Sequence, residues 1–324
     1  MACYHPSQMF VMVDPSTGAL TYKLAGRAIE TARHARQINA NNPNVIDVIN
    51  IPCRRCAGCR LDYSRDWANR MLLEYQRTRK AVFVTLTYDD LHIPVSDHVL
   101  PTLDKRDCQL FLKRVRKYFA GTEIRFFLGG EYGPSTHRPH YHAILFGVDL
   151  LDFGTLTVRN VNELGQCAYE SGILNKLWPN GFSTVAAVSF QTFAYCSRYI
   201  LKKQRTSDYI LDDTQKYLPE FSLMSRRPGL GAYAVDDSAL DGINCTVSDG
   251  TDTKTFPLPA ALLRRLKDVD PQKYAELKFA RKNIADDRLA MELEHTSLPF
   301  TEYLKQREDS LLARTVRIRN RKEL

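Results

Sequence analysis

The chain has 324 residues, of which 44% are apolar and 25% are charged, a composition typical of globular proteins. No apolar run approaches the ~18 residues of a membrane span, and the start, MACYHPSQMF, lacks the basic and apolar regions of a signal peptide; we therefore expect a cytosolic protein without membrane contact. The formal net charge of +8 suits a polyanionic partner such as nucleic acid.

The first third of the chain combines a cysteine run with one clear helix and one clear strand. Residues 27–42 predict a short helix, and the run CRRCAGC follows at 53–59. Apolar residues recur near a 3.6-residue period over 61–80, which predicts a helix. The alternating, β-branched stretch AVFVTLTYDD at 81–90 predicts a strand.

The middle of the chain interleaves strands with helices. We expect an amphipathic helix over 104–120 with Asp104 as its N-cap, strands over 123–133 and 140–148 joined by a turn, a short helix and a strand within 172–190, and a helix over 192–204. The order β–α–β–β–α–β–α predicts an α+β fold with a mostly antiparallel central sheet.

The pattern weakens beyond about residue 205. Residues 225–233 predict a loop, 236–259 irregular structure or a small hairpin, and the remainder charged helices. We therefore divide the chain into a cysteine-rich and helical extension (1–80), a core domain (81–205), an irregular region (206–257) and a charged helical region (258–324). The chain contains no Walker A phosphate loop.

The stretch RPHYHAILFG places two histidines in an apolar strand. Side chains alternate along a strand, so His140 and His142 share one face, while Tyr141 and Ala143 share the other. The predicted hairpin brings Glu131 towards them, which completes a three-residue set for one metal ion. The alternative is two hydrogen-bonded histidines on a sheet edge. A cupin-type site is disfavoured, because no glutamate follows the histidines closely.

The helix over 192–204 carries two tyrosines. Tyr195 and Tyr199 are four residues apart and share a helix face, with Arg198 and Lys202 each three residues beyond one of them. A neighbouring cation favours the phenolate and can hold a phosphate. The alternative is that both tyrosines only pack. Together with a metal site, they indicate attack of a phenolate on a phosphodiester.

The cysteine run predicts a structural zinc site. Cys53, Cys56 and Cys59 supply three thiolates, and a structural zinc ion takes four ligands, so Cys3 or His5 would have to complete the set. The alternative is a group of reduced, packed cysteines. The predicted DNA contacts are the basic residues Arg54, Arg55, Arg60 and Lys203.

These motifs resemble those of a known family. RPHYHAILFG resembles the histidine–hydrophobic–histidine motif of HUH endonucleases, the rolling-circle replication initiators, FVTLTYDD their first motif, GGEYG the position of their acidic ligand, and YCSRYILKK their two-tyrosine motif, with Arg198 where a lysine is usual. PCRRCAGCRLDYSRDWANR and FSLMSRRPGLG resemble initiators of gokushovirus-type microviruses, small phages with circular single-stranded DNA. The resemblance covers roughly residues 1–235.

The resemblance implies a ferredoxin-like HUH nicking domain over 81–205 and site-specific nicking and rejoining of origin DNA. It implies Glu131, His140 and His142 as ligands of Mg²⁺ or Mn²⁺, Tyr195 and Tyr199 as nucleophiles, and Lys202 and Arg198 as phosphate contacts. Single-stranded origin DNA, a host helicase and a host DNA polymerase are the implied partners, and the host bacterial cytoplasm is the implied location. Two rival hypotheses stand: a zinc-stapled nucleic-acid-binding protein without catalysis, and a related relaxase or transposase.

Overall fold

The computed structural model describes residues 3–27, 44–95, 101–133, 136–162, 165–202, 218–235, 240–241, 243–248 and 253–319. The chain forms two compact units, Met1–Tyr63 with Lys278–Glu323, and Ser64–Leu277. Apart from Arg27, the helix predicted over 27–42 lies outside the described residues. No helix in the described ranges combines the length and the apolar character needed to cross a bilayer.

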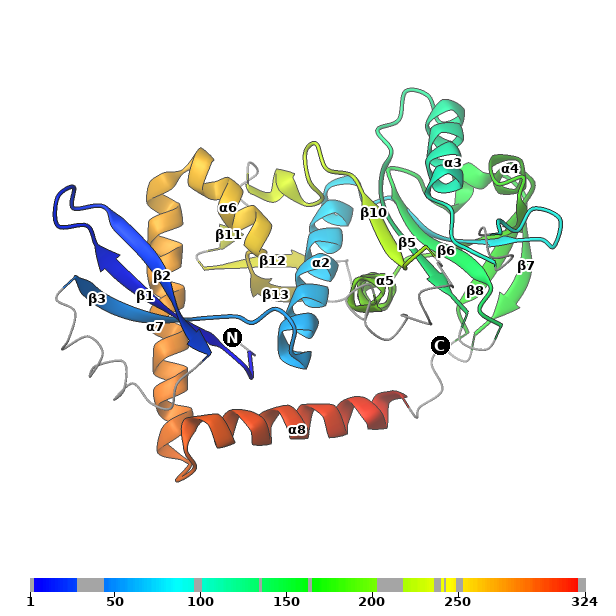
Figure 1. Cartoon of the computed structure of the whole chain (residues 1–324). Helices are drawn as coiled ribbons and strands as arrows, with labels where there is room; N and C mark the ends of the chain where they lie inside the picture. Colours follow the sequence, from blue (N-terminus) through cyan, green and yellow to red (C-terminus); the bar gives the residue numbers. More distant parts are fainter. Residues whose placement is uncertain are drawn as a thin grey trace. The chain divides into compact units, whose positions relative to one another are not determined.

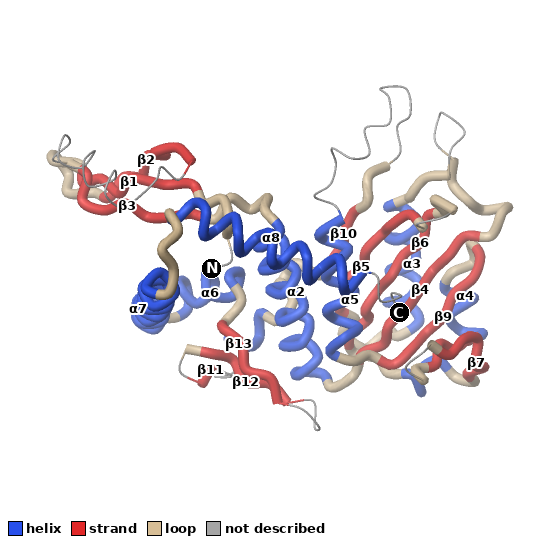
Figure 2. The backbone as a smooth tube through the Cα atoms, turned by 90° about the horizontal axis from the view of Figure 1, so that it is seen from below, coloured by secondary structure: helices blue, strands red, loops and turns tan. Residues whose placement is uncertain are grey.

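A seven-stranded antiparallel sheet forms the centre of the unit Ser64–Leu277 (Figure 2). It confirms the predicted α+β class. The strands are, in order across the sheet, β10 (Phe221–Met224), β5 (Arg125–Tyr132), β6 (Pro139–Phe146), β4 (Ala81–Tyr88), β9 (Gly181–Ala187), β8 (Cys167–Ser171) and β7 (Leu156–Val161).

Helices cover both faces of this sheet (Figure 1). On one face lie α3 (Lys105–Tyr118), α4 (Gly172–Leu177) and the short 3₁₀ helix η1 (Leu150–Phe153). On the other lie α5 (Phe190–Lys202) and the part of α2 (Ala57–Thr78) that belongs to this unit. Each buried Phe or Leu in these layers contributes roughly 1.5–3 kcal/mol to stability.

The two-residue repeat of β6 decides which side chains meet which layer. Tyr141, Ala143 and Leu145 pack in the core beneath α3, whereas Ile144 and Phe146 pack in the core beneath α2 and α5. His140 and His142 have the parity of Ile144, so they face the α2 and α5 side. The predicted division of this strand into a packed face and a histidine face is confirmed.

Most predicted elements of the core are confirmed with shifts of a few residues. Asp104 is the N-cap of α3, and its carboxylate accepts a hydrogen bond from the backbone N–H of Arg106 at 2.5 Å. The sequence did not indicate β7, β8 or β10. β10 lies within the segment expected to be irregular, and its four residues, FSLM, are too few to show a period.

A second, smaller sheet in this unit contains β11 (Leu240–Asp241), β12 (Asn244–Ser248) and β13 (Thr253–Pro257) in that order, followed by α6 (Ala260–Val269). β12 and β13 pair antiparallel, so of the two structures considered for 236–259 the hairpin is the one observed. The four-part division of the chain made from the sequence stays a prediction.

The unit Met1–Tyr63 with Lys278–Glu323 contains a three-stranded antiparallel sheet and long helices. The sheet order is β2 (Leu20–Arg27), β1 (Ser7–Val13) and β3 (Val45–Ile51). The helices are α8 (Phe300–Arg319), the part of α7 (Pro271–Glu294) that belongs to this unit, and the start of α2. The charged helices expected near the C-terminus are confirmed.

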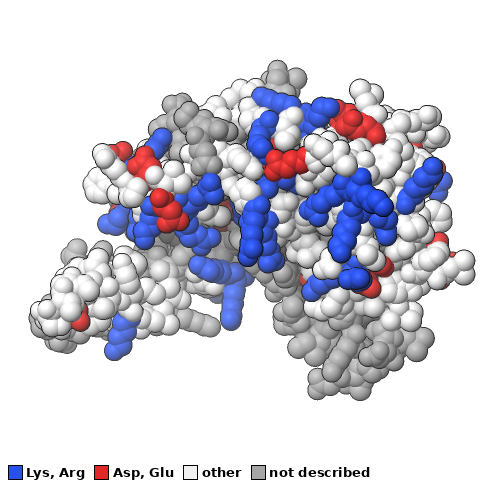
Figure 3. Space-filling view, turned by 90° about the horizontal axis from the view of Figure 1, so that it is seen from above, with Lys and Arg blue, Asp and Glu red and all other residues white. Residues whose placement is uncertain are grey.

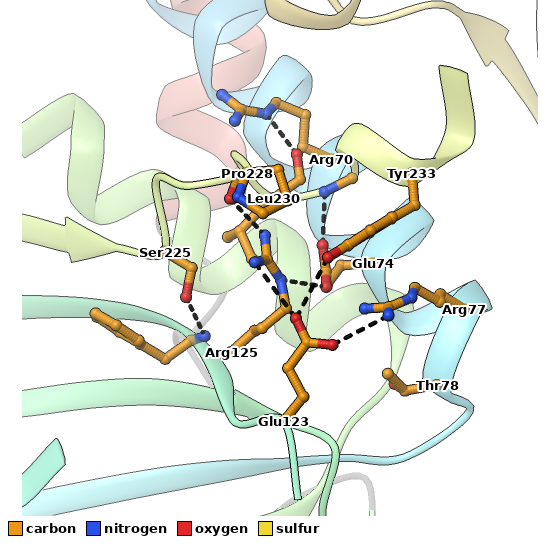
Figure 4. A network of polar contacts seen from close by, with 12 residues as sticks. Arg70, Glu74, Arg77, Thr78, Glu123, Arg125, Ser225, Pro228, Leu230 and Tyr233 are labelled. Carbon is orange, nitrogen blue, oxygen red and sulfur yellow. Dashed lines mark hydrogen bonds and ion pairs between the residues drawn. The ribbon is translucent and has the colours of Figure 1, made fainter. Parts of the chain in front are cut away.

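A buried ion pair fixes the segment that follows β10 (Figure 4). Glu74 of α2 and Arg125 of β5 lie 2.6 Å apart, and their side chains are 0% and 5% exposed. Arg125 also donates to the carbonyl of Pro228 at 2.8 Å, and the second carboxylate oxygen of Glu74 accepts from the N–H of Gly231 at 2.7 Å. The pair therefore ties α2, the sheet and residues 228–231 together.

Gly231 is required at its position in this network. Its φ is +73°, and a Cβ there would lie 2.9 Å from the carbonyl oxygen of Arg70. Arg70 donates from Nε to the carbonyl of Leu230 at 3.1 Å. The backbone of this loop is thus held from several directions by α2, which gives a physical reason for the residues RPGLG.

We expect Glu74→Gln to lower the free energy of unfolding by about 3 kcal/mol, because it leaves the buried Arg125 guanidinium without its counter-charge. Urea denaturation followed by circular dichroism measures this. The matched control is Glu123→Gln, which also removes a carboxylate near Arg125 but whose side chain is 52% exposed; it should cost less than about 1 kcal/mol. Equal costs for the two variants would contradict the role given to the buried pair.

Candidate active site

Three predicted metal ligands come together at one end of β5 and β6. Glu131 and His140 are direct cross-strand partners, and each offers a ligand atom within 4.8 Å of one on His142. Oε1 of Glu131 lies 2.9 Å from Nε2 of His140 and 3.4 Å from Nε2 of His142. Glu131 and His142 are buried, whereas the His140 side chain is 19% exposed. The cluster is therefore open on the side of His140.

The far nitrogens of both imidazoles have partners that orient the rings. Nδ1 of His140 lies 3.1 Å from the carbonyl oxygen of Arg138, so this nitrogen carries the proton. Nδ1 of His142 lies 3.2 Å from the hydroxyl of Thr85 on β4, its cross-strand partner. Ligating histidines commonly have such second contacts, which fix the tautomer.

This arrangement has the electrostatics of a cation site. With the proton on Nδ1, neutral His140 directs the lone pair of Nε2 at a carboxylate oxygen only 2.9 Å away. Two acceptors at that distance repel each other unless a proton or a metal ion lies between or beside them. Two imidazole nitrogens and one carboxylate oxygen are a common set for a divalent ion with open positions.

Tyr195 of α5 lies against the metal cluster. Its ring centroid is 5.7 Å from that of His142, with an interplanar angle of 79°. Phe83 of β4 stacks on the His142 ring at 5.4 Å and 4°, and also contacts Tyr195 edge-on at 6.2 Å. α5 is held at this place by Phe193 and Cys196, which are buried in the core that faces the sheet.

The other predicted catalytic residues follow on the same helix. The Arg198 guanidinium lies over the Tyr195 ring at 5.6 Å, and the residue is exposed. Tyr199 and Lys202 lie within the bounds of α5, so the helix predicted to carry both tyrosines is confirmed. Lys203 lies outside the described residues.

Sequence reasoning missed the supporting shell. Thr85 was expected beside the site without a role, and neither Phe83 nor the Arg138 carbonyl was singled out. Register alone could have found Thr85, because an antiparallel neighbour of a histidine strand places every second side chain on the histidine face. The carbonyl of Arg138 carries no sequence signal, because every residue has a carbonyl group.

A second cluster, of four thiols, lies in the other unit. The sulfurs of Cys3, Cys53, Cys56 and Cys59 all lie within 4.8 Å of one another. The register explains why Cys3 joins the run: Ser7 of β1 pairs with Ile51 of β3, so the residues before β1 and after β3 emerge at the same end of the sheet. His5 instead lies 2.5 Å from Glu308 of α8. The fourth position is therefore that of Cys3.

Backbone N–H groups surround these sulfurs. Those of Arg55 and Cys56 donate to Cys53, that of Cys53 to Cys3, and those of Tyr4 and Cys59 to Cys56. Burial opposes ionisation of Cys53, but the donors from Arg55 and Cys56 outweigh it and lower the pKa of this thiol to about 7. Burial raises the pKa of Cys3 and Cys59 above the ordinary range. Binding of a metal ion would therefore release protons.

The basic residues of the run lie around this cluster. Arg54 has a φ of +62°, which turns the chain back between Cys53 and Cys56. Arg54 and Arg55 are exposed and Arg60 is partly exposed. These positions leave their guanidinium groups accessible to solvent.

Comparison with known proteins agrees with the site. Residues 81–204 match the family model described as replication-associated protein ORF2. The matched segment begins with β4 and includes β5, β6 and α5, hence the whole metal cluster and both tyrosines. The chain belongs to this family of replication-associated proteins.

Three relatives in this family come from microviruses. The replication-associated protein ORF2 of Spiroplasma virus 4 is 29% identical over 83% of this chain and 85% of its own length. VP4 of Bdellovibrio phage phiMH2K is 35% identical over 47% of this chain and 48% of its own, and ORF4 of Chlamydia phage 1 is 31% identical over 47% and 38%. The chain thus spans half or less of the latter two relatives. No solved structure matches the chain.

The position of Cys3 generates a direct test of the thiol cluster in this family member. We expect Cys3→Ser to reduce the tightly held metal to well below one ion per chain, because a structural site of this kind needs four ligands. Elemental analysis of the purified protein after mild chelation measures this. His5→Ala, the variant of the other candidate ligand, should retain the metal. Loss of metal in His5→Ala with retention in Cys3→Ser would contradict the assignment.

Proposed function

We propose that this replication-associated protein nicks and rejoins single-stranded phage DNA at an origin through a phosphotyrosine intermediate, as the initiating enzyme of rolling-circle replication. The observation that carries the proposal is the contact of Tyr195 with His142, a member of the Glu131, His140 and His142 cluster. It places a potential nucleophile beside a potential metal site. Of the rival hypotheses, a relaxase or transposase is disfavoured by the replication-associated relatives.

The three clustered residues would hold a Mg²⁺ or Mn²⁺ ion. The mixed nitrogen and oxygen set also accepts softer divalent ions, so the geometry favours a divalent cation in general and the family favours the harder ones. When bound, the ion withdraws charge from the scissile phosphate and so stabilises the transition state of attack. Thr85 and the Arg138 carbonyl keep both Nε2 atoms directed at the ion.

Tyr195 would supply the attacking oxygen. Its phenol loses a proton, the phenolate oxygen forms a bond to phosphorus, and the bond from phosphorus to the 3′ oxygen breaks. That oxygen takes up a proton and becomes a free 3′-OH, while the 5′ end remains linked to the tyrosine. The guanidinium of Arg198, which lies over the ring, favours the phenolate and can contact the phosphate.

The second tyrosine would allow rejoining. One phosphodiester replaces another at each step, so the energy of the cleaved bond is kept in the protein–DNA link. Tyr199 would cleave after a round of synthesis, and the newly freed 3′-OH would attack the first link to circularise the strand. Lys202, one turn beyond Tyr199 on α5, would contact the second phosphate.

The thiol cluster would bind a structural Zn²⁺ ion. Four sulfurs with several backbone N–H donors suit zinc better than a harder ion. The ion would fix the beginning of α2, since Cys56 directly precedes this helix and Cys59 lies in its first turn. Arg54, Arg55, Arg60 and Lys203 would be DNA contacts. The non-catalytic alternative keeps this zinc staple but gives the tyrosines no reaction.

Replication by this route needs further partners. The nicked strand must be unwound and extended, and we propose that a host helicase and a host DNA polymerase do this in the bacterial cytoplasm. The 3′-OH freed by nicking would serve as the primer for that polymerase.

We expect Tyr195→Phe to reduce the covalent protein–DNA adduct by at least about 100-fold, because the attacking oxygen is removed. The assay incubates the protein with single-stranded origin DNA and Mn²⁺ and resolves the adduct on a denaturing gel. Tyr118→Phe is the matched control, since Tyr118 is 53% exposed on α3, and it should form the adduct normally. Absence of any wild-type adduct, or an undiminished adduct in the Tyr195→Phe/Tyr199→Phe double variant, would favour the non-catalytic alternative.

We expect His140→Ala to weaken Mn²⁺ binding by more than about 10-fold, because one of three ligands is lost. Electron paramagnetic resonance of free Mn²⁺ during a titration measures the affinity without DNA. His137→Ala serves as the control: this histidine is exposed on the turn before β6 and lies outside the cluster. Equal affinities for the two variants would exclude His140 as a ligand.

A further inference from the structure

A basic groove lies on the face of the large sheet opposite to the histidines. It encloses about 310 Å³ between α3 and the edge strand β10. Its floor is apolar and includes Leu112 of α3, Phe126 of β5 and Leu223 of β10, and its rim carries Lys113, Arg116 and Arg226. Phe126 has the parity of Leu128, which packs beneath α3, whereas Glu131 has the opposite parity. The groove is therefore separate from the metal cluster.

The rim belongs to a strongly basic surface. In Figure 3, which looks down on the side where α3 lies in Figure 1, Lys and Arg side chains outnumber Asp and Glu. In the described ranges no ion pair involves Lys113, Arg116 or Arg226, and all three are exposed. α3 carries Lys105, Arg106, Lys113, Arg114, Arg116 and Lys117 against one acidic residue, Asp107, whose carboxylate accepts from the Tyr88 hydroxyl.

Cations lie over aromatic rings at both sides of β10. Arg116 lies 5.4 Å from the centre of the Phe126 ring, and Lys105 lies 5.2 Å from that of Phe221. β10 is fixed by its antiparallel pairing with β5, and the hydroxyl of Ser225 accepts from the N–H of Phe126 at 3.1 Å. The groove is thus built from paired strands and a capped helix, so its charges are held in place.

We propose that this groove binds the sugar–phosphate backbone and bases of a single DNA strand, as a second contact surface for the substrate of the proposed nicking reaction. The inference rests on the proposed function only in taking DNA as the substrate. A rim of unpaired cations attracts phosphates, and an apolar floor with cation-covered aromatic rings is suited to unstacked bases. A duplex would present phosphates to the rim but keep its bases away from the floor.

The test compares two triple variants with the same change in charge. Lys113→Ala/Arg116→Ala/Arg226→Ala removes the rim, whereas Lys176→Ala/Arg264→Ala/Lys267→Ala removes three exposed cations elsewhere in the same unit. The probe is a fluorescein-labelled oligo-dT of about 30 nucleotides, and its affinity is measured by fluorescence anisotropy at several salt concentrations without a divalent ion. A blunt duplex of equal length forms the second arm.

We expect the rim variant to bind oligo-dT about 10-fold or more weakly than wild type, with a salt slope reduced by about 2, since each lost phosphate contact reduces it by about 0.7. The control variant should show a much smaller change, and Lys113→Arg/Arg116→Lys/Arg226→Lys should bind like wild type. Equal affinities of the two alanine variants would overturn the proposal. A larger loss on the duplex than on the single strand would overturn the choice of occupant.

This experiment does not depend on the nicking reaction. The rim residues lie outside the metal cluster and α5, so the rim variant should still form the covalent adduct when origin DNA is saturating. If wild type forms no adduct but the rim variant loses affinity, the proposed function fails and the groove remains a DNA-binding surface. If the adduct forms and affinities are equal, the groove proposal alone fails.

Discussion

The antiparallel register of β5, β6 and β4 is the constraint on which the site depends. It pairs Glu131 with His140 on one side of β6 and Thr85 with His142 on the other, and all four side chains have the parity that faces α5. A slip of one residue would turn the histidines into the core beneath α3 and expose Tyr141 and Ala143. Burial of these apolar neighbours therefore fixes the polar ligands: the hydrophobic layer chooses the face, and the register chooses the partners.

The same layer brings the tyrosine helix to the ligands. Ile144 and Phe146 continue the histidine face of β6 into the core that contains Phe193 and Cys196 of α5. One strand face thus changes from apolar to polar along its length, and the helix packed on its apolar part extends over its polar part. Tyr195 consequently meets His142 through packing that needs no direct bond between the two residues. The Glu74–Arg125 pair supports this assembly by joining α2 to β5.

Periodicity predicted what it can encode, and contacts between distant segments account for the rest. The strands and helices over 81–202 have clear two- or 3.6-residue repeats, so the core class, the N-cap at Asp104 and the two faces of β6 followed from the sequence. β10 is too short to show a repeat, and β7 is largely exposed, so its pattern carries no burial signal. The choice between Cys3 and His5 depended on the pairing of β1 with β3, strands far apart in the sequence. The guanidinium over Tyr195 agrees with the predicted place of Arg198, whereas its role in phosphate binding stays a prediction.

The central claim is that a tyrosine of α5 becomes covalently joined to DNA beside the metal cluster, and peptide mapping of the adduct tests it most directly. Trypsin cleaves after Lys176, Arg198 and Lys202, so the two tyrosines fall on separate peptides, 177–198 and 199–202. After reaction with origin DNA and Mn²⁺ and digestion of the DNA, mass spectrometry should find a 5′-linked nucleotide on the peptide with Tyr195 or on that with Tyr199. A nucleotide on any other residue, or an unmodified protein after incubation with the metal, would contradict the account.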